Sequence, residues 1–360
     1  MGDLTVSLAE KLTGQDAAQI QRLDASSRRL EKVKNLRGCG RLVRLDLSHN
    51  LLESLGGIGG CRTLTWLDLS HNQLDSLAGV QYLTSLSVIR ASNNSITSCV
   101  DLSNLTSLKA LILSHNQLSC LPGLSSLSEL NTLVISHNKF ESVSVDSLKK
   151  LSKLSVSNNA LKAVPNTQNN IELRELRLNG NYIKSLPESL KCNGKLKIID
   201  LGNNKLKTIS VLEPLSSLDQ LVNLNIKGNQ LCECPNYLQE VLGLVASVKI
   251  LDGGKVDGLA LDRECEVSGG DEKSKKSESK ATAENTVKRS VGKEKQKRER
   301  GAAEEDLTAK SLARKRKKSQ GRAGDDGRDS ECVKKRLSVG VPTEISEKYE
   351  AYRGEEREWD

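Results

Sequence analysis

Apolar and polar positions follow a fixed pattern along most of the chain, and the stretch from Leu42 to Ile58 shows it clearly. Its sequence, LVRLDLSHNLLESLGGI, has apolar residues at the spacing LxxLxLxxNxL, with one Asn among them. The LxL part has the two-residue period of a short strand. A unit this short cannot bury its own apolar face, so it must stack on copies of itself. The pattern therefore predicts a repeat protein with one strand per unit.

The unit recurs with a nearly constant length. The residues that open its LxL strand are 22 apart at first and then 21, 22, 23 and 25 apart: Leu23, Leu45, Leu67, Ile89, Leu111, Leu133, Leu154, Leu176, Ile199 and Leu224. This length and pattern are typical of leucine-rich repeats. We therefore predict an α/β solenoid of about ten repeats. Its strands should add into one curved parallel sheet on the order of 45 Å long, at about 4.8 Å per strand.

An Asn follows the strand in every unit except the first, which has Arg28 in its place. These residues are Asn50, Asn72, Asn94, Asn116, Asn138, Asn159, Asn181, Asn204 and Asn229. An Asn amide both donates and accepts hydrogen bonds. We therefore expect each Asn to turn inward and pair with backbone groups that the bend would otherwise leave without partners.

The two ends of the solenoid need covers, because each terminal repeat would otherwise leave an apolar edge in water. At the N-terminus, Leu4, Leu8 and Leu12 are four apart and Gly14 follows them, which predicts a capping helix within residues 1–19. Residues 20–230 hold the repeats. At the other end, residues 231–254 contain Tyr237, Val241, Leu244, Val248 and Leu251, the pattern of an amphipathic helix followed by a closing strand.

Residues 255–360 lack this periodicity and are rich in Lys, Glu, Ser and Gly. Such a composition buries too little apolar surface to offset the entropy of ordering, so we predict a disordered charged tail. The net charge of the chain is +8, and residues 287–318 alone hold 13 Lys/Arg against 5 Asp/Glu. The sequence thus places the basic character in a cluster within the tail.

Five consecutive basic residues stand at the end of this cluster: Arg314, Lys315, Arg316, Lys317 and Lys318. Such a run is typical of a nuclear localisation signal or a nucleic-acid contact, although a solvated linker has the same composition. No aromatic residue lies nearby to stack on bases, so nucleic-acid binding through it should be weak, non-specific and salt-sensitive. Ser338 follows Lys335 and Arg336 at the spacing that basophilic kinases prefer, and it is a candidate phosphorylation site.

The 22-residue spacing, the LSHNxL and LxGNxL strings and the segment GNQLCECPNYLQEVLGLVASVKILDG resemble the leucine-rich repeat class of regulatory subunit 7 of protein phosphatase 1. The U2 small nuclear ribonucleoprotein A-prime and axonemal dynein light chain 1 are similar in repeat and cap. The resemblance covers residues 20–253. It implies a non-enzymatic protein that binds a protein partner with the concave face or an edge of the solenoid. The chain lacks a [Lys/Arg]-Val-x-Phe/Trp docking peptide for phosphatase 1, since its one Phe, Phe140, lies inside the repeats.

The residues that flank each inward strand leucine should point outward on the concave face. They form two columns, of which one begins Arg22, Arg44, Trp66, Val88, and the other begins Asp24, Asp46, Asp68, Arg90. We predict the partner-binding residues among them: Arg44, Trp66, Val88, Arg90, Ile112 and Val134. An exposed apolar patch centred on a Trp is typical of a binding hot spot, although tolerated variation is an alternative. The three Asp side chains would lie about 4.8 Å apart, which is unfavourable unless neighbouring arginines compensate them, so a self-satisfied charge ladder is favoured.

Histidines and cysteines give no strong sign of a metal or catalytic site. His49, His71, His115 and His137 all occupy one slot of the repeat, which holds Asn or Gly elsewhere, so structural tolerance is favoured over metal binding. The CxC of Cys232 and Cys234 has no second pair at zinc-finger spacing. No catalytic triad or paired carboxylates fit the repeat register. We therefore predict neither enzymatic activity nor a cofactor.

These observations favour a monomeric interaction scaffold that binds a protein on its concave face and carries a nuclear-targeting tail. Two alternatives are a regulatory subunit of protein phosphatase 1 and a nucleic-acid or chromatin adaptor that acts through the basic tail. The sequence lacks a signal peptide and any apolar run near 18 residues, so we expect no membrane span. The basic run at 314–318 predicts a nuclear location, shared in part with the cytoplasm.

Overall fold

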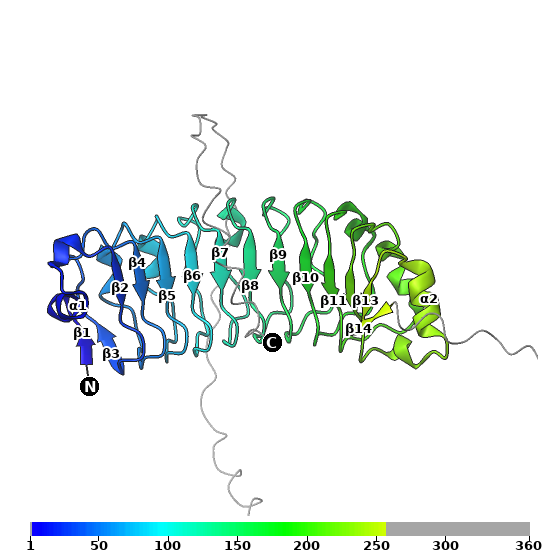
Figure 1. The fold of residues 1–360 in the computed structure, drawn as a ribbon, viewed down its shortest axis with the longest axis horizontal. Coiled ribbons are helices and arrows are strands. Elements are labelled where there is room, and N and C mark those ends of the chain that lie inside the picture. The colour runs from blue at the N-terminus through cyan, green and yellow to red at the C-terminus, as the bar shows by residue number, and fades with distance from the viewer. Residues whose placement is uncertain (1, 257–360) are drawn as a thin grey trace, which may run out of the picture. The chain divides into compact units, whose positions relative to one another are not determined.

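The computed structural model of the chain describes residues 2–256; the predicted tail, including residues 314–318 and Ser338, lies outside the described residues. One 12-stranded sheet runs through the described part, and the strands follow one another in chain order from β2 to β14 (Figure 1). All neighbouring pairs are parallel except β13 with β14. The strands are β2 (Arg22–Asp24), β4 (Arg44–Asp46), β5 (Trp66–Asp68), β6 (Val88–Arg90), β7 (Ala110–Ile112), β8 (Thr132–Val134), β9 (Lys153–Ser155), β10 (Glu175–Arg177), β11 (Ile198–Asp200), β12 (Asn223–Asn225), β13 (Ile250–Leu251) and β14 (Gly254–Lys255).

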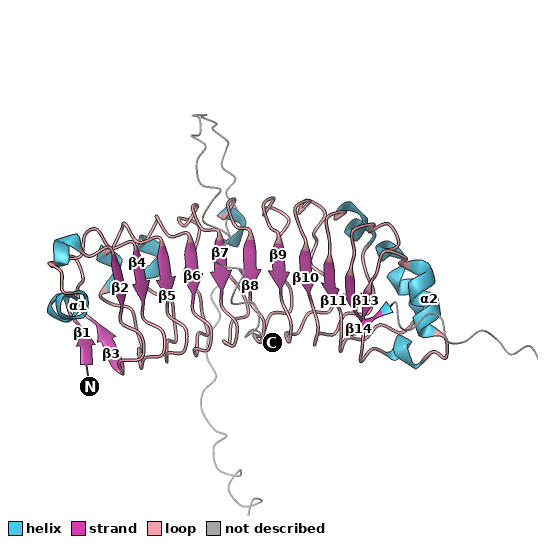
Figure 2. Ribbon diagram, in the orientation of Figure 1, coloured by secondary structure: helices cyan, strands magenta, loops and turns pink. Residues whose placement is uncertain are grey.

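The return path of each repeat is mostly irregular, with short 3-10 helices in several repeats (Figure 2). These helices span Ala17–Gln19, Ile58–Gly60, Val80–Tyr82, Leu124–Ser126, Glu188–Cys192, Ile209–Leu215 and Gln230–Glu233. Between the sheet and this return path lies a core of aliphatic residues, to which each repeat contributes fully buried leucines such as Leu45, Leu47 and Leu52. The predicted solenoid is confirmed.

The Asn residues make the inward contacts that we expected. The side-chain amide of Asn50 donates to the carbonyl oxygens of Ala25 and Leu47, each at 2.9 Å. Its Oδ1 accepts the backbone N–H groups of Arg28 and Leu30, each at 3.0 Å. The same contacts recur in the later repeats, so each Asn joins its own repeat to the preceding one.

The residue before each Asn adopts a left-handed backbone conformation. His49, His71, His115 and His137 have φ between 54° and 56°, and Asn93, Asn158 and Asn203 have φ between 51° and 55°. Gly180 and Gly228 take the same slot with φ of 68° and 76°. Asn, His and Gly are the residues that adopt this region most readily. This backbone requirement explains why the histidine slot also holds Asn and Gly.

The N-terminal cover is a helix with a strand in front of it. Helix α1 spans Val6–Thr13; Thr5 caps its start by accepting the N–H of Leu8 at 3.1 Å, and Gly14 ends it with φ 66°. Leu4 lies outside the helix, because β1 (Gly2–Leu4) pairs in parallel with β3 (Leu30–Val33). This second, two-stranded sheet buries Leu4 against the first repeat.

The C-terminal cover combines α2 (Tyr237–Leu244) with β13 and β14. The helix ends before Val248, which lies in the turn that leads to β13. Asp252 closes the sheet: its Oδ1 accepts the N–H groups of Ile226 at 2.7 Å and Lys227 at 2.9 Å. Within the repeats the equivalent amide donates to a backbone carbonyl of the next strand, as the N–H of Leu201 does to Asn225 at 2.7 Å, so the Asp252 carboxylate takes the place of that carbonyl.

Candidate protein-binding face of the sheet

The strand register places the predicted binding residues in the two columns that the sequence indicated. In one column Arg44 pairs with Trp66 and Trp66 with Val88. In the other, Asp68 pairs with Arg90, Arg90 with Ile112 and Ile112 with Val134. The leucine or isoleucine between the columns is buried in every one of these strands. Both columns therefore lie on the face of the sheet that points away from the core.

The aspartates at the N-terminal end of this face are satisfied by their own repeats. Oδ1 of Asp24 accepts both the N–H and the hydroxyl of Ser26, at 3.0 and 2.7 Å. Asp46 makes the same two contacts with Ser48, and Asp68 accepts the N–H of Ser70. The side-chain and backbone hydrogen bonds of Ser26 lower the pKa of Asp24. These contacts favour the self-satisfied ladder as the explanation of the three aspartates.

Trp66 is covered rather than exposed. Only 7% of its surface is accessible, and the guanidinium carbon of Arg44 lies 3.6 Å from the centroid of its ring. The expectation of an exposed Trp is therefore wrong, because the long side chain of the preceding strand folds over the indole in a cation–π contact. The indole Nε1 is buried and finds no acceptor among the described residues.

Charged residues at the other end of the face also satisfy one another. Oε1 of Glu175 lies 3.3 Å from Nζ of Lys153 and 2.6 Å from Nε of Arg177. Nearer the middle, Arg90 Nε lies 3.6 Å from Asp68 Oδ2. The aspartates and ion-paired residues named here thus have partners within the sheet.

Between these flanks lies an apolar patch on β6, β7 and β8. Its members are neighbours in the register, none is fully buried, and the core lies on the opposite face of the sheet: Val88, Ala110, Ile112, Thr132 and Val134. We call these five residues the central patch. Since the fold does not use it, the central patch is the part of the sheet face that a partner can desolvate at low cost.

The histidines form two stacked pairs along one edge of the sheet. The rings of His49 and His71 are 4.2 Å apart with 10° between their planes, and those of His115 and His137 are 4.0 Å apart with 12°. In-plane lone pairs of parallel rings do not converge on one ion, so these pairs do not chelate a metal as they stand. No group of three or more His, Cys, Asp or Glu in residues 2–256 is arranged to hold one.

The cysteines of the described region are free thiols, and several are buried. Burial raises the pKa of Cys61 to about 11 and that of Cys99 to about 12. A thiol with a raised pKa is a poor nucleophile at neutral pH. Cys232 is half-buried and donates to the carbonyl oxygen of Ile226 at 3.3 Å. Their environments are those of structural cysteines.

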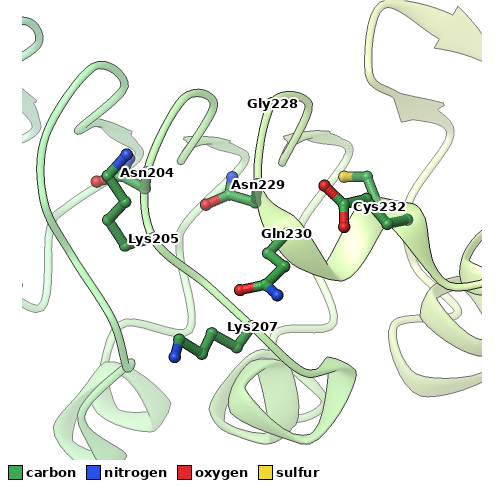
Figure 3. A pocket seen from close by; sticks show the side chains of 8 residues that line it. Asn204, Lys205, Lys207, Gly228, Asn229, Gln230 and Cys232 are labelled. Carbon is green, nitrogen blue, oxygen red and sulfur yellow. The ribbon is translucent and has the colours of Figure 1, made fainter.

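Sequence reasoning missed a shallow hollow outside the sheet. It has a volume of about 570 Å³ and lies beside the loops that follow β11 and β12 (Figure 3). Its lining includes Lys205, Lys207, Gln230 and Glu233. The signal was present in the sequence as the alternation Lys205-Leu206-Lys207, which puts two lysines on one outward face.

Comparison with known proteins supports the fold. Family models described as "Leucine rich repeat" and "Leucine Rich repeats (2 copies)" match residues 20–74 and 171–214. An acidic leucine-rich nuclear phosphoprotein 32-related protein of Plasmodium falciparum (isolate 3D7) is 28% identical over 123 residues, which are 33% of this chain and 43% of that protein. The geranylgeranyl transferase type-2 subunit alpha of Homo sapiens is 32% identical over 105 residues, 29% of this chain and 18% of that protein. The chain thus spans less than half the length of these curated relatives.

Among solved structures, the functional domain of InlJ from Listeria monocytogenes superposes with a TM-score of 0.53 at 18% identity, over 66% of this chain and 59% of that one. No helix in residues 2–256 is both long and apolar enough to cross a membrane. The repeat pattern, the single sheet in chain order and the recurring Asn contacts agree with these likenesses. The described part of the chain is a leucine-rich repeat solenoid.

Proposed function

We propose that the protein is a non-enzymatic interaction scaffold that binds a protein partner through the central patch. The observation that supports this most is the contrast within one face of the sheet. Aspartates and ion pairs on both flanks are compensated internally, whereas Val88, Ile112 and Val134 lie half-exposed. An apolar centre with a polar surround is the arrangement of protein-binding hot spots. Arg44, Trp66 and Arg90 form the border of the patch.

The test places charge in the centre of the patch. Ile112→Asp with Val134→Asp should abolish partner binding, because the partner would have to desolvate two unpaired carboxylates. Thr97→Asp with Ser119→Asp adds the same charge at exposed positions outside the sheet and should leave binding intact. Binding is measured by cross-linking mass spectrometry of the full chain in nuclear extract. Cross-links to the sheet face that persist in the patch variant would refute the proposal.

A nuclear location is part of the proposal. Its support is the run of five basic residues at 314–318, together with a partial likeness to a protein whose name places it among nuclear phosphoproteins. Replacing residues 314–318 by Gln should move a fluorescent fusion of the full chain from the nucleus to the cytoplasm. Unchanged nuclear fluorescence would show that this run is not the import signal.

Regulation of protein phosphatase 1 is a second candidate, supported by the repeat length and by the helix-then-strand C-terminal cover. Purified chain added to purified phosphatase 1 should then change substrate turnover. The central-patch variant should lose that effect if the phosphatase is the partner. An unchanged turnover at saturating chain would remove this candidate and leave the scaffold proposal in place.

A further inference from the structure

The net positive charge of the solenoid lies in its C-terminal half. Residues 1–148 hold 13 Lys/Arg and 13 Asp/Glu, whereas residues 149–255 hold 15 and 9, a net charge of +6. The excess is therefore on the last repeats and the C-terminal cover. This basic half is separate from the cluster in the tail and from the central patch.

Part of this charge is gathered on the outward face of the neighbouring loops that follow β10, β11 and β12. Ile183 and Leu206 are buried, so the residues on either side of each point outward. The N–H of Lys205 donates to the carbonyl of Ile183 at 2.9 Å, and the N–H of Leu231 donates to that of Leu206 at 3.1 Å, so the loops lie side by side. We call the exposed residues they bring together the lysine edge: Tyr182, Lys184, Lys205, Lys207 and Gln230.

The lysine side chains of the lysine edge make no polar contacts within the described part of the chain. Among residues 2–256 the side chains of Lys184, Lys205 and Lys207 form no ion pair or hydrogen bond, in contrast to Lys162, which lies 3.2 Å from Glu141. Tyr182 is 53% exposed. Beside these lysines lies the hollow of about 570 Å³, which Gln230 also lines (Figure 3). Three free cations, an exposed aromatic ring and a concave floor thus meet in one place.

Acidic residues limit the length of this basic run. Glu141, paired with Lys162, stands on one side of it, and Glu233 lines the hollow on the other. The free lysines therefore span two adjacent repeats, which are about 5 Å apart at the strand spacing. A nucleic-acid strand gains affinity from many phosphate contacts along an extended track, which this short run does not provide. An extended peptide advances about 3.3 Å per residue, so two or three residues cover the run.

We propose that the lysine edge is a second docking site, which takes a short acidic segment of a protein partner. Carboxylates of the segment pair with Lys184, Lys205 and Lys207, and an apolar side chain of the segment packs on Tyr182. Gln230 donates or accepts one hydrogen bond at the floor of the hollow. This site lies outside the sheet face and does not depend on the central patch.

The test compares two triple charge reversals in the full chain. Lys184→Glu, Lys205→Glu and Lys207→Glu remove the lysine edge, whereas Lys149→Glu, Lys197→Glu and Lys249→Glu change three exposed lysines elsewhere in the same half. The probe is a fluorescein-labelled ten-residue peptide with Glu at alternate positions, measured by fluorescence anisotropy at low salt. The edge variant should bind about tenfold more weakly than the control variant, since three close charge pairs are lost. Unchanged circular dichroism and unfolding midpoints establish that both variants fold.

Equal losses in the two triple variants would overturn the proposal, because binding would then follow net charge alone. The proposal is also overturned if the edge variant binds a ten-nucleotide single-stranded RNA more weakly than the control variant does, while both variants bind the peptide equally. The ligand of the lysine edge would then be a nucleic acid. Tyr182→Ala tests the aromatic contact without changing the charge. This variant should lose more affinity for a peptide that carries one Leu between its Glu residues than for an otherwise identical peptide with Ser at that position. The Ile112→Asp, Val134→Asp variant should bind both peptides normally, so failure of one docking site is distinguishable from failure of the other.

Discussion

At the scale of single residues, backbone geometry and hydrogen bonding determine which residue types occupy the Asn position of each repeat and the position before it. The slot before each Asn requires positive φ, and this accounts for His, Asn and Gly there without any metal or catalytic role. The Asn itself is fixed by hydrogen bonds to two repeats. The pattern of apolar residues reveals the Asn, whereas the positive φ of its neighbour is visible only in the structure.

Replacing a buried Asn should cost more than its size suggests. The Asn72 amide donates to the carbonyls of Leu47 and Leu69, and its Oδ1 accepts the N–H of Leu52. Asn72→Leu leaves the buried N–H of Leu52 without its acceptor and removes one of the two Asn amides that donate to each carbonyl, since Asn50 still donates to Leu47 and Asn94 to Leu69. We therefore expect a loss of about 2–3 kcal/mol in the free energy of unfolding. Gln73→Leu, at the exposed neighbouring position, should change it by about 0.5 kcal/mol or less. Urea unfolding measures both, and similar losses would contradict the assignment.

The histidine pairs should make stability depend on pH. Burial, followed by the charge of the stacked partner, lowers the pKa of His71 and of His137 below the ordinary value of 6.5. Between the folded and the ordinary pKa the unfolded chain binds more protons, so this stability is present above pH 6.5 and is lost as pH falls through the folded pKa.

His71→Asn with His137→Asn keeps residues that tolerate positive φ but removes the titration. The unfolding midpoint of this variant should fall less steeply than that of the natural chain between about pH 7 and pH 5. Carboxylate protonation acts on both proteins alike and cancels in the comparison. Parallel pH profiles would show that the pairs do not contribute.

At the scale of elements, the two covers differ in how far the sequence predicts them. The helical period and Gly14 indicate α1, but nothing in Gly2–Leu4 indicates a strand, because its partner β3 is a return segment of the first repeat. Long-range pairing of this kind leaves no local pattern. The same limit applies to Trp66: its column follows from the repeat register, but the Arg44 side chain that covers it does not.

Asp252 ends the sheet by accepting backbone amides of the last full repeat. Asp252→Ala removes the acceptor of the Ile226 amide and the partner of the Tyr237 hydroxyl. The Lys227 amide loses one of its two acceptors and keeps Asn225 Oδ1 at 3.2 Å. We expect the Ile226 amide to exchange hydrogen much faster and the free energy of unfolding to fall by about 1–3 kcal/mol. Asp252→Asn retains an acceptor and tolerates the φ of 53°, so it should largely preserve both. Equal exchange rates in the two variants would exclude this role.

At the scale of the whole molecule, the sequence predicts the framework well and its surfaces less completely. Strand order, register and core follow from one repeated pattern, since every repeat meets only its neighbours. Surfaces depend on which outward residues satisfy each other. Glu175, for example, forms ion pairs with Lys153 and Arg177, although the sequence alone does not show that these three charged residues pair with one another. The lysine edge depends on the loops after β10 and β11, which the hydrogen bond from the N–H of Lys205 to the carbonyl of Ile183 holds side by side.

The Asn contacts also bear on how the chain is made. Oδ1 of each Asn completes the backbone of the repeat before it, as Asn50 does for Arg28 and Leu30. A repeat leaving the ribosome therefore stays open until the next one emerges and supplies its Asn. We expect the solenoid to fold during synthesis from the N-terminal helix onward, with each repeat completed only when the next has been made. One incomplete repeat would then stay exposed to chaperones until Asp252 has been synthesised and accepts the amide of Ile226.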